Sequence, residues 1–271
     1  TAMMDRPHII FNQRTGKYVA WLKIMGKLPS FAILQADQIL GPYEMVNPSL
    51  NPCGMAVGDF DLDIEPADGK GYLFSERPHI CTVRADVTDD YSGVTGMYAE
   101  HFGHQGPPDT REATAHSIRG GKHYLLTSGT TGYHPNPSEA AISDCWHGPY
   151  TVQGDPHVGD PSRTSFNSQI SCVFRHPKKK DLYIACADRW LPHLSEQEGE
   201  AFANGEGYRK VAEILRAVFS GGGDIEFNDD ENSNMLFINS SESDYVWLPL
   251  RFEGERVYID WKDEWRTEDY E

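Results

Sequence analysis

The stretch Gly16-Lys17-Tyr18-Val19-Ala20-Trp21 returns in altered form as Gly69-Lys70-Gly71-Tyr72-Leu73-Phe74 and as Gly121-Lys122-His123-Tyr124-Leu125-Leu126. Successive copies start about fifty residues apart, an interval typical of one propeller blade. Each copy indicates a tight glycine turn that leads into an apolar, aromatic-rich strand. The repeat therefore predicts a β-propeller in which every copy belongs to one four-stranded blade.

A second element recurs behind the first and third copies. Segments 37–43 and 144–150 both end in Gly-Pro-Tyr, and we expect a short strand after each. Weaker copies of the repeat follow at 181–185 and 254–261. A β-sandwich would contain similar strands, but it gives no reason for this interval. The expected fold is an all-β propeller. Residues 1–271 form a single propeller domain, and they supply about four of its blades.

One stretch departs from this pattern. Between about residues 192 and 235 the sequence predicts a helical insertion, which Gly221-Gly222-Gly223 interrupts. Apolar side chains recur there at spacings of three and four, namely at Tyr208, Val211, Ile214, Leu215, Val218 and Phe219. We expect this helix to pack on the propeller rim, with a lid or an oligomer contact as the alternative.

Composition narrows the classes of partner. The formal net charge of −17 disfavours nucleic acid and anionic membranes, because both carry dense negative charge. Neutral carbohydrate is compatible with such a surface, since carboxylates accept hydrogen bonds from hydroxyls. Solubility alone is an equally good explanation of the acidity. No apolar run approaches the length of a membrane span.

The cysteine pattern bears on compartment and cofactors. The five cysteines form no C-x-x-C pair of the kind that binds zinc, and their number is odd. We expect buried thiols in a reducing compartment, and the absence of a visible signal also favours the cytoplasm. A secreted protein with one disulfide is the alternative. No metal site and no organic cofactor are expected.

Three acidic residues stand at equivalent places, just ahead of the repeated strands: Asp5, Asp59 and Glu112. The innermost strand of each blade lines the propeller axis, so acids at matching blade positions should converge on one pocket. Clustered carboxylates raise one another's pKa, which allows a glutamic acid to keep its proton near neutral pH. Such a proton donor is what hydrolysis of a glycosidic bond requires.

The segments around these acids, with several others along the chain, resemble glycoside hydrolase family 43. The resemblance is to its exo-β-1,3-galactanase branch and to the related galactosidase and arabinofuranosidase branches. The matching segments span nearly the whole chain: 5–12, 15–18, 58–62, 111–113, 127–137, 165–169, 188–190 and 245–250. The Arg111-Glu112-Ala113 run and the Ser128-Gly129-Thr130-Thr131-Gly132 loop are the most specific. Thr114 departs from the family pattern, which usually has proline after this alanine.

The resemblance implies roles for individual residues. Glu112 is expected as the general acid and Asp59 as the acid that orients it and tunes its pKa. Gln169 stands where this branch carries a glutamine in place of the usual base, and Asp5 where it carries a sugar-binding glutamate. Further sugar contacts are expected from Thr130, Thr131, Tyr133, Asn136 and Asn167, although turn chemistry alone also explains this loop.

The family has five blades, so the resemblance implies that the first blade is absent here and is supplied by a missing segment or another chain. The expected function is an inverting, exo-acting glycoside hydrolase that releases a terminal sugar, galactose first, from galactan or arabinogalactan side chains. The alternatives are an α-L-arabinofuranosidase or β-xylosidase of the same family, or a sugar-binding propeller without catalysis. The resemblance also leaves room for a structural cation in the propeller channel.

Overall fold

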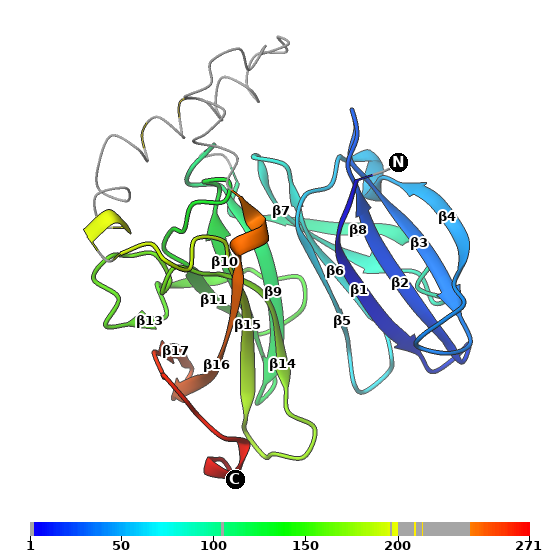
Figure 1. The fold of residues 1–271 in the computed structure, drawn as a ribbon. Helices are drawn as coiled ribbons and strands as arrows, with labels where there is room; N and C mark the ends of the chain where they lie inside the picture. The colour runs from blue at the N-terminus through cyan, green and yellow to red at the C-terminus, as the bar shows by residue number, and fades with distance from the viewer. Residues whose placement is uncertain (1–2, 104–105, 196, 200–208, 210–212, 214–238) are drawn as a thin grey trace.

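The computed structural model describes residues 3–103, 106–195, 197–199, 209, 213 and 239–271. Its strands form four sheets (Figure 1). The first sheet contains β1 (Met4–Asn12), β2 (Lys17–Ile24), β3 (Ser30–Ala36) and β4 (Glu44–Leu50), and the second β5 (Phe60–Ile64), β6 (Gly71–Arg77), β7 (Cys81–Val87) and β8 (Val94–His101). The third contains β9 (Arg111–Arg119), β10 (Lys122–Gly129), β11 (Glu139–Ser143) and β12 (Thr151–Gly154).

The fourth sheet closes the described part of the chain. It contains β14 (Gln169–Arg175), β15 (Tyr183–Arg189), β16 (Asp244–Glu253) and β17 (Arg256–Asp260), and the short β13 (His157–Val158) pairs with β17 in parallel. Three single turns of 3₁₀ helix complete the described elements: η1 (Pro52–Gly54), η2 (Ser240–Glu242) and η3 (Thr267–Asp269). None of the helices in these ranges is long and apolar enough to cross a membrane.

The sheets are arranged as propeller blades. Within each one, consecutive strands pair antiparallel from the innermost strand outward. Neighbouring sheets meet through their innermost strands, because β1 packs on β5, β5 on β9 and β9 on β14. The predicted all-β propeller with about four blades in this chain is therefore confirmed. The predicted helical insertion at about 192–235 lies almost entirely outside the described residues.

The repeated sequence marks the same position in three blades. Gly16, Gly69 and Gly121 lie in the hairpin turns that precede β2, β6 and β10, and all three have positive φ, a conformation that glycine adopts without steric cost. The Gly-Pro-Tyr segments at 41–43 and 148–150 each precede the outermost strand of a blade. Turns of this kind thus mark the start of the second strand in three blades and of the fourth strand in two of them.

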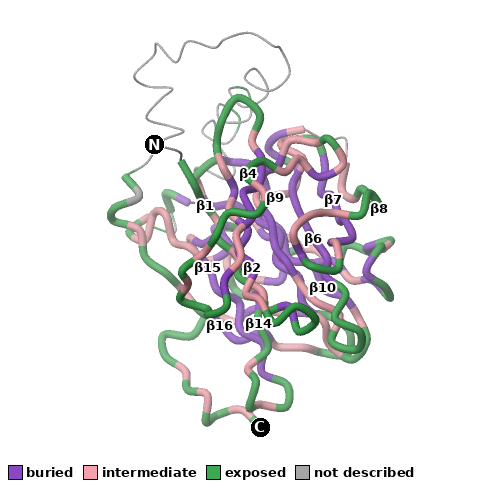
Figure 2. Tube along the Cα trace, turned by 90° about the vertical axis from the view of Figure 1, so that its right-hand side faces the viewer, coloured by how far each residue is buried: buried purple, intermediate pink, exposed green. Residues whose placement is uncertain are grey.

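Apolar side chains fill the space between adjacent sheets, and Figure 2 shows this buried band through the centre of the molecule. Trp21 on β2 is an example: its side chain is fully buried between the first two sheets, and its indole Nε1 donates a hydrogen bond to the Tyr91 carbonyl at 2.9 Å. A buried tryptophan of this kind contributes both packing and a satisfied polar group.

Two sheet faces keep large apolar side chains exposed. On β1, Ile9 and Phe11 alternate with the inward-facing Ile10 and are exposed, and on β16 the exposed Trp247 alternates with the buried Leu248. Trp247 also contacts Phe174 of β14 edge to face. These faces belong to the first and the last sheet. The expected further blade between those two sheets stays a prediction.

Replacing Trp21 with alanine should lower the free energy of unfolding by about 3–5 kcal/mol, because it removes a buried aromatic and leaves a cavity. The matched control is Trp247→Ala, which should cost less than about 1 kcal/mol since that indole is 54% exposed. Urea denaturation of both variants measures the difference. Equal losses would contradict the assignment of Trp21 to the core between blades.

Candidate active site

A cavity of about 640 Å³ lies where the innermost strands of the sheets converge. It is bounded by the start of β1, the residue before β5, the start of β9, and the ends of β14 and β15 that face it. The polar and aromatic side chains that line it are Asp5, Arg6, His8, Lys23, Asp59, Glu112, Tyr133, Gln169, Ser171, Cys172, Asp188 and Trp190. The three acids at equivalent blade positions therefore share one pocket.

Irregular backbone directs these side chains toward the axis. The pairing of β1 with β2 shifts register between Asp5 and His8, where Arg6 has a φ of 47°. The pairing of β9 with β10 shifts beside Glu112, where Ala113 has a φ of 48°. Bulges of this kind bend a strand and turn a side chain in a new direction, and they are common beside active sites.

Asp59 is fixed as an anion. Its Oδ1 lies 2.9 Å from Nε of Arg6 and 3.0 Å from Nζ of Lys23. Burial opposes ionisation of Asp59, but the charges of Arg6 and Lys23 outweigh it and hold the pKa of this carboxyl below its usual range. Lys23 also reaches Asp5 at 3.0 Å, so one ammonium group joins two acids of the site.

Glu112 has the opposite electrostatic environment. Burial raises the pKa of Glu112 well above its ordinary value, and the neighbouring carboxyls of Glu76 and Asp59 raise it further. Its Oε1 accepts a hydrogen bond from Nε2 of Gln169 at 3.3 Å. The pKa values of these two carboxyls are thus shifted in opposite directions, that of Asp59 toward the charged form and that of Glu112 toward the protonated form.

A third acid, Glu76 on β6, lies behind this pair. Burial raises the pKa of Glu76 to about 7, and the charge of Asp59 acts in the same direction. Its Oε1 accepts a hydrogen bond from the His79 backbone N–H at 2.7 Å. Only glycine fits at position 58, because a Cβ there would lie 2.0 Å from Oε2 of Glu76.

Gln169 connects the first sheet to the last across the cavity. Its Oε1 accepts a hydrogen bond from Nη2 of Arg6 at 3.0 Å, and its Nε2 donates to Glu112 and, at 3.1 Å, to Oγ of Ser128. These partners fix the orientation of the amide, with the carbonyl toward Arg6. Gln169 is therefore a rigid part of the cavity wall.

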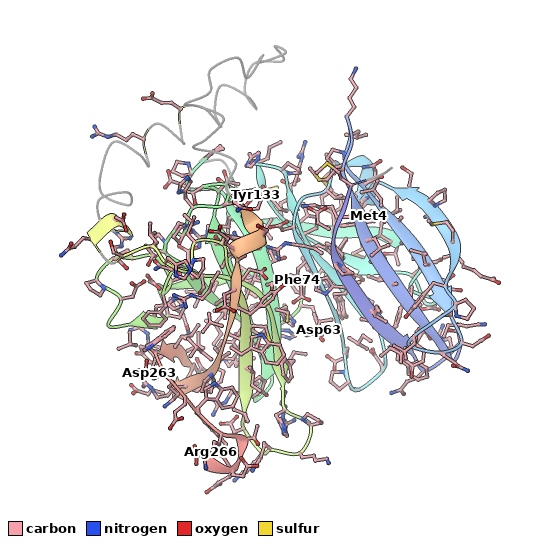
Figure 3. All side chains as sticks on the ribbon, viewed as in Figure 1. Met4, Asp63, Phe74, Tyr133, Asp263 and Arg266 are labelled. Atoms are coloured by element: carbon pink, nitrogen blue, oxygen red, sulfur yellow. The ribbon has the colours of Figure 1, made fainter. Side chains whose placement is uncertain are left out.

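The loop after β10 divides into two parts. Thr130, Thr131 and Asn136 are buried and do not line the cavity: Nδ2 of Asn136 donates to Oγ1 of Thr131 at 2.7 Å, and its Oδ1 accepts from the Gly129 N–H at 2.7 Å. Tyr133 does reach the cavity, where it meets Trp190 edge to face at 5.1 Å. Figure 3 places Tyr133 toward the upper end of the sheets, above Phe74 and Asp63.

Asn167 is also outside the cavity. Its Nδ2 donates to the Leu194 carbonyl at 2.6 Å, and it borders a separate surface pocket with Asp160 and Trp261. The buried side chains of the loop at 130–136 therefore shape the backbone that presents Tyr133. Of the predicted sugar contacts in this loop, Tyr133 lines the cavity, whereas Thr130, Thr131 and Asn136 are buried outside it.

Three acids of the site, Asp5, Asp59 and Glu112, were predicted from the sequence. Two cations, Arg6 and Lys23, and two further acids, Glu76 and Asp188, were not. A signal was present for two of them. Lys23 continues the apolar face of Val19 and Trp21 at intervals of two, and Glu76 similarly follows Tyr72 and Phe74. A charged residue that ends an apolar strand face indicates a buried, paired charge.

Cys53, Cys81, Cys145, Cys172 and Cys186 carry no disulfide. Within the described ranges, no group of three or more His, Cys, Asp or Glu side chains is placed to hold a metal ion.

Propeller blades surround an axial pocket that is lined by a glutamic acid of raised pKa and an ion-paired aspartate. This fold and these groups define a class of protein equipped for glycoside hydrolysis. No protein-family model matches the chain, and no curated protein matches it. Solved structures do match. A GH43 β-1,3-galactosidase superposes with a TM-score of 0.73 at 23% identity, over 99% of this chain and 47% of that protein.

Two exo-β-1,3-galactanases are similar as well. The one from Phanerochaete chrysosporium has a TM-score of 0.66 at 21% identity, over 95% of this chain and 48% of its own. The one from Clostridium thermocellum has a TM-score of 0.69 at 20% identity, over 95% and 49%. The fold of this chain is therefore that of GH43 galactosidases and galactanases, as the sequence resemblance predicted. The chain spans about half the length of these three proteins.

The raised pKa of Glu76 predicts a pH-dependent stability. Between the ordinary carboxyl value of about 4.5 and about 7, the unfolded chain releases this proton while the folded chain keeps it. The free energy of unfolding should therefore fall as pH rises through this window, by at most about 1.4 kcal/mol per pH unit from this group. Glu76→Gln should remove that slope. Parallel stability curves for the two proteins, measured by urea denaturation at several pH values, would contradict the assignment.

Proposed function

We propose that this chain carries the catalytic site of an exo-acting, inverting glycoside hydrolase that releases terminal galactose from β-1,3-galactan or arabinogalactan side chains. The observation that carries the proposal is that one axial pocket is lined by Glu112, whose pKa is raised, and by Asp59, whose pKa is lowered. Hydrolysis of a glycosidic bond begins with a proton donor held against the leaving oxygen.

Glu112 would donate its proton to the glycosidic oxygen. Asp59 raises the pKa of Glu112 through its charge, and the pair Arg6 and Lys23 keeps that charge in place. Asp5 and Gln169 would hold hydroxyls of the sugar, since both line the cavity and carry hydrogen-bonding oxygens. Tyr133 and Trp190 offer aromatic surface to the sugar ring near the pocket entrance.

Asp59 and Glu112 line the pocket as half-buried residues, so a sugar in the pocket can reach both carboxyls. Exo action is proposed because similar proteins are exo-β-1,3-galactanases. The choice of galactan rests on the similar proteins, one of which has been solved with β-1,3-galactotriose.

The test compares the unmodified chain with Glu112→Gln on β-1,3-galactan and arabinogalactan. The variant should lose about 10²- to 10⁴-fold in the rate of sugar release, because the proton donor is gone, while it still binds the oligosaccharide. Glu44→Gln, a change at an exposed position on β4, is the matched control and should keep full activity. Released monosaccharide is quantified by chromatography.

The outcomes also separate the alternatives. Release of arabinose or xylose from matching substrates, with the same dependence on Glu112, would assign the site to an arabinofuranosidase or a β-xylosidase. Oligosaccharide binding by both folded proteins without any turnover would contradict the hydrolase and favour a sugar-binding propeller.

A further inference from the structure

Two of the five free cysteines lie directly opposite one another in the last sheet. Cys172 of β14 pairs with Cys186 of β15 in antiparallel register. The other three come from separate parts of the chain: Cys53 from η1, Cys81 from β7 and Cys145 from the segment between β11 and β12. Directly opposed residues of an antiparallel pair stand about 4.5–5.5 Å apart at Cα. A disulfide can bridge Cα atoms roughly 4.4–6.8 Å apart, so the register of this pair permits one.

The local backbone holds these two cysteines in place. The pairing of β14 with β15 shifts register between Ile170 and Cys172, and the Ser171 hydroxyl donates a hydrogen bond to the Cys186 carbonyl at 3.2 Å. Opposed side chains point to the same face of a sheet, and the two thiols are close enough to hydrogen-bond to each other. A disulfide therefore requires rotation of two side chains and an approach of their Cβ atoms by roughly 1 Å.

The two thiols differ in what can reach them. Cys172 is half-buried and lines the axial cavity. Cys186 is only 7% exposed and belongs to an apolar cluster with Leu182 and Ile184, against which Trp265 packs. A small oxidant in the cavity thus meets Cys172 first, and Cys186 lies beside it as a second, covered thiol.

We infer that Cys172 and Cys186 form a reversible redox pair, in which a hydroperoxide that enters the axial cavity oxidises Cys172 and Cys186 then closes a cross-strand disulfide. Neither thiol has a part in the proposed hydrolysis, so this pair stands apart from the proposed function. The disulfide would join β14 to β15 beside Gln169 and Asp188, which also line the cavity. The redox state of the pair is therefore built into the cavity wall.

The charge environment divides the two roles. The Cys186 thiol donates a hydrogen bond to the Cys172 sulfur, which lowers the pKa of Cys172 and raises that of Cys186. The positive charge of Arg6 also lowers the pKa of Cys172, whereas burial and the carboxyl of Asp188 oppose this shift. The thiolate is the form that attacks a peroxide, and Cys172 is the thiol of the pair that ionises more readily.

The oxidation takes place in two steps. The Cys172 thiolate attacks one oxygen of hydrogen peroxide and becomes a sulfenic acid, while the O–O bond breaks and the other oxygen takes up a solvent proton and leaves as water. The Cys186 sulfur then attacks the Cys172 sulfur, the S–O bond breaks, and the hydroxyl leaves as water with the Cys186 thiol proton. Two thiols are oxidised and one peroxide is reduced to two waters. A dithiol such as dithiothreitol reverses the reaction by exchange through a mixed disulfide.

The experiment treats the reduced chain with a small excess of hydrogen peroxide, denatures it in N-ethylmaleimide, and counts the blocked thiols by mass spectrometry. Five maleimide groups are expected before oxidation, one for each free cysteine, and two fewer after it. Trypsin cleaves between the two cysteines at Arg175 and Lys180, so an unreduced digest should contain their two peptides joined. Dithiothreitol should separate the peptides and restore the full count of thiols.

Variants separate the roles of the two thiols. Cys186→Ala should stop the reaction at the sulfenic acid of Cys172, which dimedone traps as an adduct on that peptide. Cys172→Ala should leave Cys186 unoxidised, because its thiol is covered and its pKa is raised. Cys145→Ser, at an exposed cysteine outside the pair, is the matched control and should form the same disulfide as the unmodified chain. Thermal unfolding of each variant checks that it is folded.

Three results would overturn the redox pair. One is an unmodified chain that keeps all five thiols under these conditions. Another is a disulfide that joins Cys172 or Cys186 to a different cysteine. The third is Cys172 converted to a sulfinic acid, which dithiothreitol does not reduce, while Cys186 keeps its thiol. The peptide map needs only the unmodified chain, so a variant that fails to fold does not alter the decision.

Discussion

The ion pairs between Asp59 and the two cations Arg6 and Lys23 determine how charge is distributed at the propeller axis. Without these cations, burial would neutralise Asp59, and the site would contain several protonated acids of similar kind. With them, Asp59 stays charged, whereas burial and the carboxyls of Glu76 and Asp59 raise the pKa of Glu112 against the opposing charges of Arg6 and Lys23. These opposite shifts are the basis of the roles proposed for Asp59 and Glu112.

The blade architecture brings these groups together. Each of the functional side chains comes from, or next to, a strand near the axis, and adjacent sheets pack firmly through buried apolar side chains. The backbone departs from regular pairing on β1 beside Arg6 and on β9 beside Glu112. The repeated blade supplies rigidity, and these local irregularities supply the direction of each side chain.

The sequence predicted much of the fold, because glycine turns such as Gly16 and Gly121 recur at a fixed interval and mark blade hairpins. It also predicted which acids meet, since equivalent strands share one axis. It could not show that Lys23 joins two acids, because ion pairs across sheets depend on register and bulges. Nor could it separate the buried Thr130 from Tyr133, which reaches the cavity from the same loop.

The most direct test of this account is a titration of Glu112 by NMR, with ¹³C-labelled glutamate carboxyls and Glu112→Gln to assign the resonance. The account predicts that the Glu112 carboxyl titrates well above its ordinary value in the folded chain. A Glu112 resonance that titrates near the ordinary carboxyl value of 4.5 would contradict it, because no proton would then be available for the leaving oxygen.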